Sequence, residues 1–158
     1  MEIQDIIESV GAMDGVLVLT PRPGDGSPEI AWGDTFFYYA PDGVVPKAQP
    51  FATIVTKDYP GDDTSRLDRP DAFRLNIAAG AEEFGRWTRS GPTDPGTADV
   101  IGPHPVYGSL HWLAVVNPGP ETATAVDELL REAHRLARER FQRHANRGRA
   151  DARDGQTG

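Results

Sequence analysis

Two apolar runs separated by a heavily charged loop constrain the fold more than any other part of this sequence. Residues 51–56 (FATIVT) and 73–77 (FRLNI) are rich in β-branched and aromatic residues, which is typical of β-strands. The loop between them, residues 57–72, carries eight charged side chains. We therefore expect two central strands of a sheet, with the loop forming one wall of whatever site the protein has.

The second of these runs alternates between apolar and polar residues. Phe73, Leu75 and Ile77 point to one side of an extended chain, and Arg74 and Asn76 point to the other. A strand with this pattern has one face packed on a core, while its other face is polar or partly open.

Residue periodicity places the remaining elements of secondary structure. Apolar residues at helical spacing predict helices over residues 2–12, 81–89 and 121–146. Short β-branched and aromatic runs predict further strands over residues 16–20, 29–32, 35–39 and 112–116. The 17 glycines and 14 prolines mark the loops between these elements. The predicted order is α-β-β-β-β-β-α-β-α.

Successive strands joined by turns favour antiparallel pairing, and helices near both ends of the chain can cover one face of the sheet. We therefore predict a two-layer α+β sandwich with an antiparallel sheet of about five strands. The helices should lie mainly on one face, with the first and last helices on the same side. Residues 1–146 should form a single domain, and residues 147–158 a disordered polar tail.

Several classes of protein conflict with the composition. The chain has no cysteine, which excludes disulfides, thiolate metal sites and cysteine nucleophiles. It has no apolar run long enough to span a membrane, and its acidic N-terminal segment does not resemble a signal peptide. A cytoplasmic location is therefore the expectation.

The charge distribution bears on nucleic-acid binding. The formal net charge is −8, and residues 1–118 carry 17 acidic and 8 basic side chains. An acidic body repels phosphate backbones, so we expect no binding to nucleic acid. The arginines near the C-terminus are mixed with glutamates, which is typical of a solvated helix face.

Several segments together resemble a family of small actinobacterial proteins classified as a domain of unknown function. They are IAWGDTFFYY, PFATIVTKDYPG, LDRP, FRLNI and PHPVYG, with Trp112 nearby. The resemblance extends over nearly the whole chain up to the last helix, and it implies no activity. More remotely, the element order and the HP…W…NP stretch resemble the MmcQ/YjbR-like proteins. That group includes proteins discussed as DNA binders, a role with which the acidic body conflicts.

The candidates for catalysis are His104, Lys57 and Asp58. His104 lies between two prolines, which fix the local backbone and so aim the imidazole, as a general base requires. Lys57 and Asp58 follow a predicted strand, a position where side chains commonly line pockets. The structural alternatives are a histidine that holds a loop and a surface Lys–Asp pair. We expect the loop around His104 to present the ring close to Lys57, Asp58 or Tyr59.

A further set of residues is suited to binding a ligand. Residues 36–39 are four consecutive aromatics, of which alternate ones face opposite sides of a strand. An aromatic row beside Arg74 and Asn76 would form a platform for a flat or anionic small molecule. A second apolar layer under the long loops, or a dimer interface, is an equal alternative. The candidate ligand-binding residues are Trp32, Asp34, Tyr38, Tyr59, Arg74, Asn76 and Tyr107.

The sequence points to neither a cofactor nor a metal. It lacks the P-loop, the GxGxxG and GxSxG motifs, and the spacings of common metal sites. Our leading hypothesis is a domain that binds a small polar or anionic ligand in a pocket beside the sheet. The alternatives are a small hydrolase or isomerase that uses His104 as general base, and a structural protein that dimerises through its sheet face.

Overall fold

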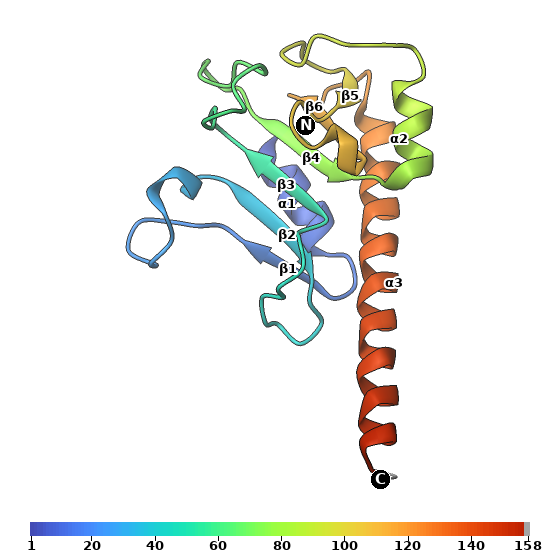
Figure 1. Cartoon of the computed structure of the whole chain (residues 1–158). Helices are drawn as coiled ribbons and strands as arrows, with labels where there is room; N and C mark the ends of the chain where they lie inside the picture. Colours follow the sequence, from blue (N-terminus) through green and yellow to red (C-terminus); the bar gives the residue numbers. More distant parts are fainter. Residues whose placement is uncertain (157–158) are drawn as a thin grey trace.

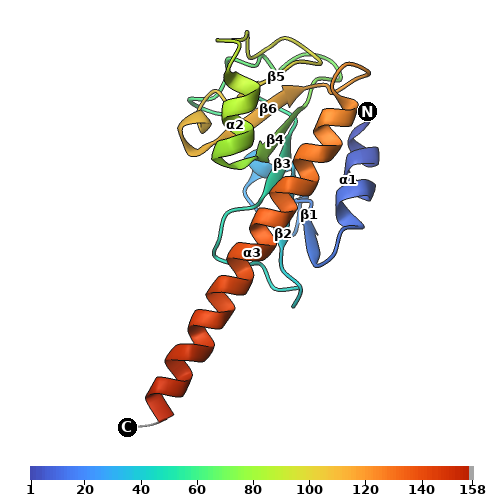
Figure 2. The same cartoon turned by 90° about the vertical axis from the view of Figure 1, so that its right-hand side faces the viewer.

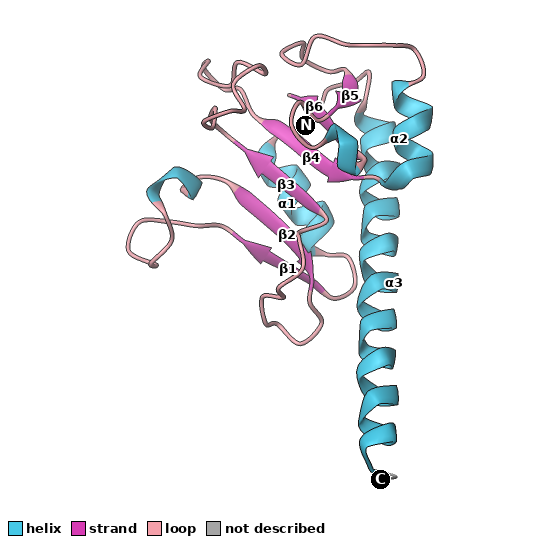
Figure 3. Ribbon diagram, viewed as in Figure 1, coloured by secondary structure: helices cyan, strands magenta, loops and turns pink. Residues whose placement is uncertain are grey.

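Strand β4 (Arg74–Ala78) lies inside a six-stranded sheet, and its successive side chains point to opposite faces of that sheet (Figures 1 and 3). The computed structural model describes residues 1–156. Its other strands are β1 (Val16–Leu19), β2 (Thr35–Tyr39), β3 (Ala52–Val55), β5 (Ile101–Pro103) and β6 (Trp112–Val116). Its helices are α1 (Ile3–Gly11), α2 (Gly80–Thr88) and α3 (Ala123–Gln156), with short 3-10 turns η1 (Glu29–Ala31) and η2 (Gly108–Leu110).

The strand order is β1-β2-β3-β4-β6-β5, and all five pairings between these strands are antiparallel. Strands β3 and β4, which contain the two runs flanking the charged loop, occupy interior positions as predicted. Leu75 of β4 pairs with Ile54 of β3 and with Val115 of β6, so three apolar residues lie side by side across the sheet. The predicted antiparallel α+β fold is confirmed.

The core lies between one face of the sheet and helices α1 and α3 (Figure 2). Ile6 and Val10 of α1 and Leu130 of α3 are almost completely buried against this face, together with Leu75 and Ile77 of β4. Helix α2 packs beside α3 near the β5–β6 end. The first and last helices therefore cover the same face, as the alternation in β4 predicted.

The segment 29–32, which we predicted to be a strand, is instead the 3-10 turn η1. Pro28 fixes its own φ before the turn, and Gly33 adopts a φ of +87° immediately after it. These two residues bend the chain at both ends of the segment, which favours a turn over an extended strand. The backbone therefore closes a single turn, in which the N–H of Ala31 donates to the carbonyl oxygen of Pro28.

Strand β5 was not predicted, because Gly102 and Pro103 are poor strand formers. It lies at the edge of the sheet, where a proline that cannot donate a ladder hydrogen bond is tolerated. With β5 counted and the segment 29–32 removed, the order becomes α-β-β-β-β-α-β-β-α and the sheet has six strands.

Helix α3 is longer than predicted. It continues through Gln156 and projects past the β1 edge of the sheet (Figures 1 and 2). Residues 147–156, which we expected to be disordered, are helical, and residues 157 and 158 lie outside the described part of the chain. Within the described residues, no helix is both long enough and apolar enough to cross a membrane.

The adjacent residues Phe37 and Phe36 provide a test of which face holds the core. Phe37 is fully buried among core residues, whereas Phe36 lies on the opposite face. We expect Phe37→Ala to lower the free energy of unfolding by about 3–5 kcal/mol, because it leaves a cavity in packed surroundings. Phe36→Ala should cost clearly less. Urea denaturation measures both, and equal losses would contradict the one-sided core.

Candidate functional site

Arg74 is a fully buried charged side chain on the open face of the sheet. Leu75 and Ile77, its neighbours on β4, point into the core, so alternation turns Arg74 and Asn76 to the other face. The loop 57–72 folds over this face, and Arg74 is only 2% exposed. A buried guanidinium must have partners, because an uncompensated charge in such surroundings costs several kcal/mol.

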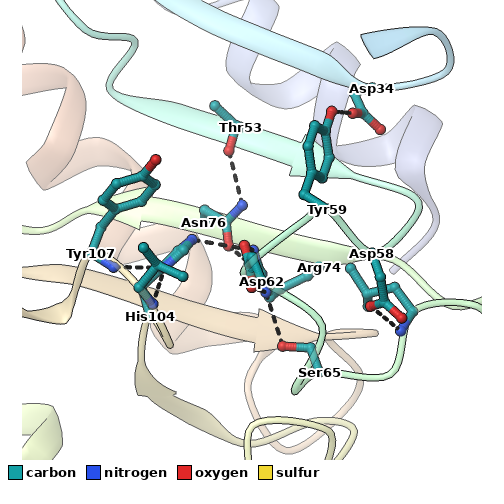
Figure 4. A network of polar contacts seen from close by, with 12 residues as sticks. Asp34, Thr53, Asp58, Tyr59, Asp62, Ser65, Arg74, Asn76, His104 and Tyr107 are labelled. Carbon is teal, nitrogen blue, oxygen red and sulfur yellow. Dashed lines mark hydrogen bonds and ion pairs between the residues drawn. The ribbon is translucent and has the colours of Figure 1, made fainter. Parts of the chain in front are cut away.

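Four of the five N–H groups of Arg74 donate to partners in the protein, and the fifth faces His104 (Figure 4). The Nε group donates to Asn76 Oδ1 at 2.7 Å. The Nη1 group donates to Asp62 Oδ1 and to Ser65 Oγ, both at 2.9 Å. The Nη2 group donates to Asp62 Oδ2 at 2.6 Å and lies 3.2 Å from His104 Nε2. Arg74 is thus the centre of a polar network that joins three segments of the chain.

Asp62 provides the opposite charge. Its two oxygens accept from the two terminal nitrogens of Arg74, which is the strongest geometry for this kind of pair. Burial would raise the pKa of Asp62, but the hydrogen bonds and positive charge of Arg74 outweigh burial and hold that pKa below its usual range. The loop around Asp62 closes through reciprocal backbone hydrogen bonds between Tyr59 and Asp62.

His104 lies directly after β5 and is 4% exposed. The backbone N–H groups of Val106 and Tyr107 both donate to its Nδ1 atom at 3.0 Å, so this nitrogen must carry the lone pair. In a neutral ring the proton then resides on Nε2, a position inferred from the hydrogen-bond network. Burial, followed by the positive charge of Arg74, lowers the pKa of His104 to about 4, against the smaller opposing influence of Asp62.

A second network centres on Asp34, which is 1% exposed. Its Oδ1 atom accepts from the backbone N–H and the hydroxyl of Thr56, both at 2.9 Å, and from Lys57 Nζ at 3.1 Å. Lys57 Nζ also donates to the carbonyl oxygens of Ile30 and Trp32, at 2.8 Å each. The three N–H groups of Lys57 therefore hold η1 against the end of β3.

Tyr59 links this second network to the open face. Its hydroxyl donates to Asp34 Oδ2 (Figure 4). Burial and then the carboxylate of Asp34 raise the pKa of Tyr59 well above its ordinary value. The hydroxyl therefore stays protonated at neutral pH and serves as a fixed donor.

The open face is hollowed into a cavity of about 550 Å³. Its floor is formed by polar side chains of β3 and β4 with His104, and its walls are mostly apolar and aromatic. The residues lining it are Ala31, Phe36, Tyr38, Gln49, Pro50, Thr53, Val55, Tyr59, Pro60, Gly61, Asp62, Arg74, Asn76, His104, Val106, Tyr107, Leu110 and Trp112.

Six of the ten residues proposed from the sequence line this one cavity. They are Tyr38, Tyr59, Arg74, Asn76, His104 and Tyr107. The other four, Trp32, Asp34, Lys57 and Asp58, lie outside the lining. As expected, the charged loop supplies one wall, through residues 59–62.

The structure separates the three candidates for catalysis. His104 contacts Arg74 and the rings of Tyr107 and Trp112, whereas Lys57 is bound to Asp34. Asp58 Oδ1 accepts the backbone N–H of Leu67 at 2.8 Å, which holds the loop in place. The hydrogen bonds of the described residues pair His104 with neither Lys57 nor Asp58. The buried, backbone-bonded ring fits the structural alternative stated for His104.

The site residues named from the sequence did not include Asp62, Thr53 or Phe36, which line the cavity. Strand alternation could have found two of them, because Thr53 pairs with Asn76 and Phe36 pairs with Thr53, and paired residues share a face. Asp62 could have been suspected, because a buried Arg74 requires a carboxylate. Its position depends on how the loop folds back, which has no signal in the sequence. The described residues contain no group of three histidine, aspartate or glutamate side chains placed to hold a metal ion.

A comparison with protein-family models matches residues 1–146 to DUF6194, a family of unknown function. The chain belongs to this family. The match covers the sheet, helices α1 and α2, and all residues that line the cavity, and it ends within α3. A search of curated proteins and a search of solved structures each gave no match. Membership in DUF6194 agrees with the resemblance to a domain of unknown function and supplies no activity.

The depressed pKa of His104 predicts how stability depends on pH. The ordinary histidine pKa of 6.5 applies to the unfolded chain, against about 4 in the folded protein. Between these values the unfolded state binds a proton that the folded state does not, so stability falls as the pH falls. Between these two pKa values, His104 should make the free energy of unfolding fall by up to about 1.4 kcal/mol for each pH unit.

His104→Asn tests this dependence, because the asparagine side-chain oxygen can still accept the two backbone N–H groups but does not titrate. We expect urea denaturation at pH 7.5, 6.5, 5.5 and 4.5 to show that the free energy of unfolding falls less with decreasing pH for the variant than for the unchanged protein. Asp62, whose pKa is lowered from 3.8, acts below this window. Parallel curves for the two proteins would contradict a neutral buried His104.

The ion pair predicts a contrast between two neighbouring aspartates. Asp62→Asn removes the charge opposite buried Arg74 and should lower the free energy of unfolding by about 3–5 kcal/mol. Asp63 is exposed, so Asp63→Asn should change stability by less than about 0.5 kcal/mol. Both variants remove one negative charge from the same loop, so the difference in their urea midpoints isolates the pair with Arg74.

Proposed function

We propose that this protein binds a small, uncharged, largely planar molecule in the cavity on the open face of its sheet. The observation that supports this is the combination of aromatic walls with a floor of fixed polar groups, in a volume of about 550 Å³. Binding sites for small molecules typically have this size and this distribution of polar and apolar surface.

The charge balance of the floor favours an uncharged ligand. The positive charge of Arg74 is compensated by Asp62, and the lowered pKa of His104 keeps its ring neutral at pH 7. An anion would approach the carboxylate of Asp62, and four of the five N–H groups of Arg74 already donate to partners in the protein. Of the polar and anionic ligands considered from the sequence, the geometry supports the polar class.

The same geometry weighs against a hydrolase or isomerase that uses His104 as general base. A base must offer a lone pair to the substrate. The Nδ1 lone pair of His104 is directed at two backbone N–H groups, and Nε2 carries the proton. Moving the proton to Nδ1 would place it against both backbone donors. A binding role needs no such change of tautomer.

A thermal-shift screen against a library of uncharged heterocycles and related metabolites tests the proposal. A ligand present at one hundred times its dissociation constant adds about 2.7 kcal/mol to the free energy of unfolding, which raises the melting temperature measurably. We expect the compounds that stabilise the protein to be planar and uncharged at pH 7.

Two valines provide a matched pair of variants that localise the binding. Val106 lines the cavity and is 44% exposed, and Val45 lies outside the lining and is 47% exposed. Val106→Asp should weaken binding at least tenfold, because a ligand in contact with the wall must then desolvate a carboxylate. Val45→Asp should bind like the unchanged protein. Equal effects of the two substitutions, or a screen without a stabilising compound, would refute the proposal.

A further inference from the structure

Two groups that line the cavity flank the same nitrogen atom, Arg74 Nη2. Asp62 Oδ2 lies 2.6 Å from Arg74 Nη2, and His104 Nε2 lies 3.2 Å from it (Figure 4). Both side chains also line the cavity, so a bound molecule can meet them side by side. The chemical character of these neighbouring groups determines which ligand edge fits the floor.

His104 is a hydrogen-bond donor toward this point. Three N–H groups approach its ring: two from the backbone at Nδ1, and one from Arg74 at Nε2. A neutral imidazole can accept at only one nitrogen. With the proton on Nε2, the ring N–H faces one other donor, the N–H of Arg74. With the proton on Nδ1, it would face two, the backbone N–H groups of Val106 and Tyr107. The Nε2–H of His104 and an N–H of Arg74 therefore face each other and share the need for an acceptor.

Asp62 is an acceptor at the adjacent position. Each of its oxygens receives a hydrogen bond from Arg74, and a carboxylate oxygen can accept more than one. The side chain of Asp62 is 15% exposed, while that of Arg74 is 2% exposed. The carboxylate is therefore the part of the ion pair that remains available to a ligand in the cavity.

We propose that the cavity recognises the cis-amide edge of a planar ring, in which a carbonyl oxygen and an N–H lie next to each other. The ligand's carbonyl oxygen accepts a hydrogen bond from His104 Nε2–H, which otherwise faces the N–H donor of Arg74. The N–H of the ligand's ring donates to Asp62. Phe36, Tyr38 and Trp112, which line the cavity, supply faces against which the ring packs. Cyclic lactams and related heterocycles carry this edge. The inference rests on the proposed function and specifies the ligand class for the same cavity.

Three bicyclic compounds of nearly the same shape test the edge. 2-Quinolone has the carbonyl and the N–H, 1-methyl-2-quinolone lacks the N–H, and coumarin has a ring oxygen in its place. We expect 2-quinolone to bind at least tenfold more tightly than either analogue, measured by titration calorimetry. Sites built to pair a ligand N–H discriminate strongly against analogues that leave the acceptor unpaired.

His104→Asn tests the donor separately. The substitution keeps an acceptor for the backbone N–H groups of Val106 and Tyr107 but removes Nε2–H, so 2-quinolone should bind about tenfold more weakly. Coumarin shares the carbonyl and should lose affinity by a similar factor. Unchanged affinity of a folded His104→Asn variant for 2-quinolone would overturn the role of His104. The comparison of the three compounds on the unchanged protein does not depend on how well this variant folds.

The outcomes separate this inference from the proposed function. Equal binding of all three compounds, weakened by Val106→Asp, would retain the ligand-binding cavity and overturn recognition of the cis-amide edge. Failure of all three compounds, alongside other stabilising molecules in the heterocycle screen, would do the same. If neither the compounds nor the screen yields binding, both proposals fail.

Discussion

The buried ion pair between Arg74 and Asp62 is the interaction on which the open face depends. A guanidinium that is 2% exposed persists only because a carboxylate, a hydroxyl and an amide accept its hydrogen bonds. The same contacts fix Asp62 and Ser65 of the loop 57–72 and set His104 beside them. The cavity floor is thus rigid for an electrostatic reason, while its walls are held mainly by loops.

The asymmetry of the fold explains why a cavity exists on this face. Helices α1 and α3 cover one face of the sheet and take up its apolar residues. The other face receives loops, and loops cover a sheet less completely than helices do. The end of β3 is secured by the Asp34 network, which ties Lys57 and Tyr59 to η1 and so holds the loop at its start. The two polar networks leave between them a space lined by aromatic rings.

The sequence predicted the parts of the molecule that follow from periodicity. Alternation in residues 73–77 identified the packed and open faces, and helical spacing identified α1 and the buried stripe of α3. Local conformation was less accessible: residues 29–32 have strand-like composition, but Pro28 and Gly33 close them into a turn. The edge strand β5 was not predicted, because Pro103 is a poor strand former.

Among the residues that line the cavity, residue type and alternation identified Arg74, Asn76 and Tyr38. Sequence reasoning chose Asp58 rather than the cavity-lining Asp62, because the two look equivalent in sequence and only the folded loop distinguishes them.

The alternation in β4 has a consequence for how the chain finds its native alignment. Arg74 and Leu75 are neighbours, and the backbone partners of Leu75 are Ile54 and Val115. If β4 slipped by one residue against either neighbour, the guanidinium would face the helices and a leucine would face Asp62. A charge without partners among core residues costs far more than a misplaced apolar side chain. The polar floor of the cavity therefore also helps to select the native strand register, because a sheet misaligned by one residue would be much less stable.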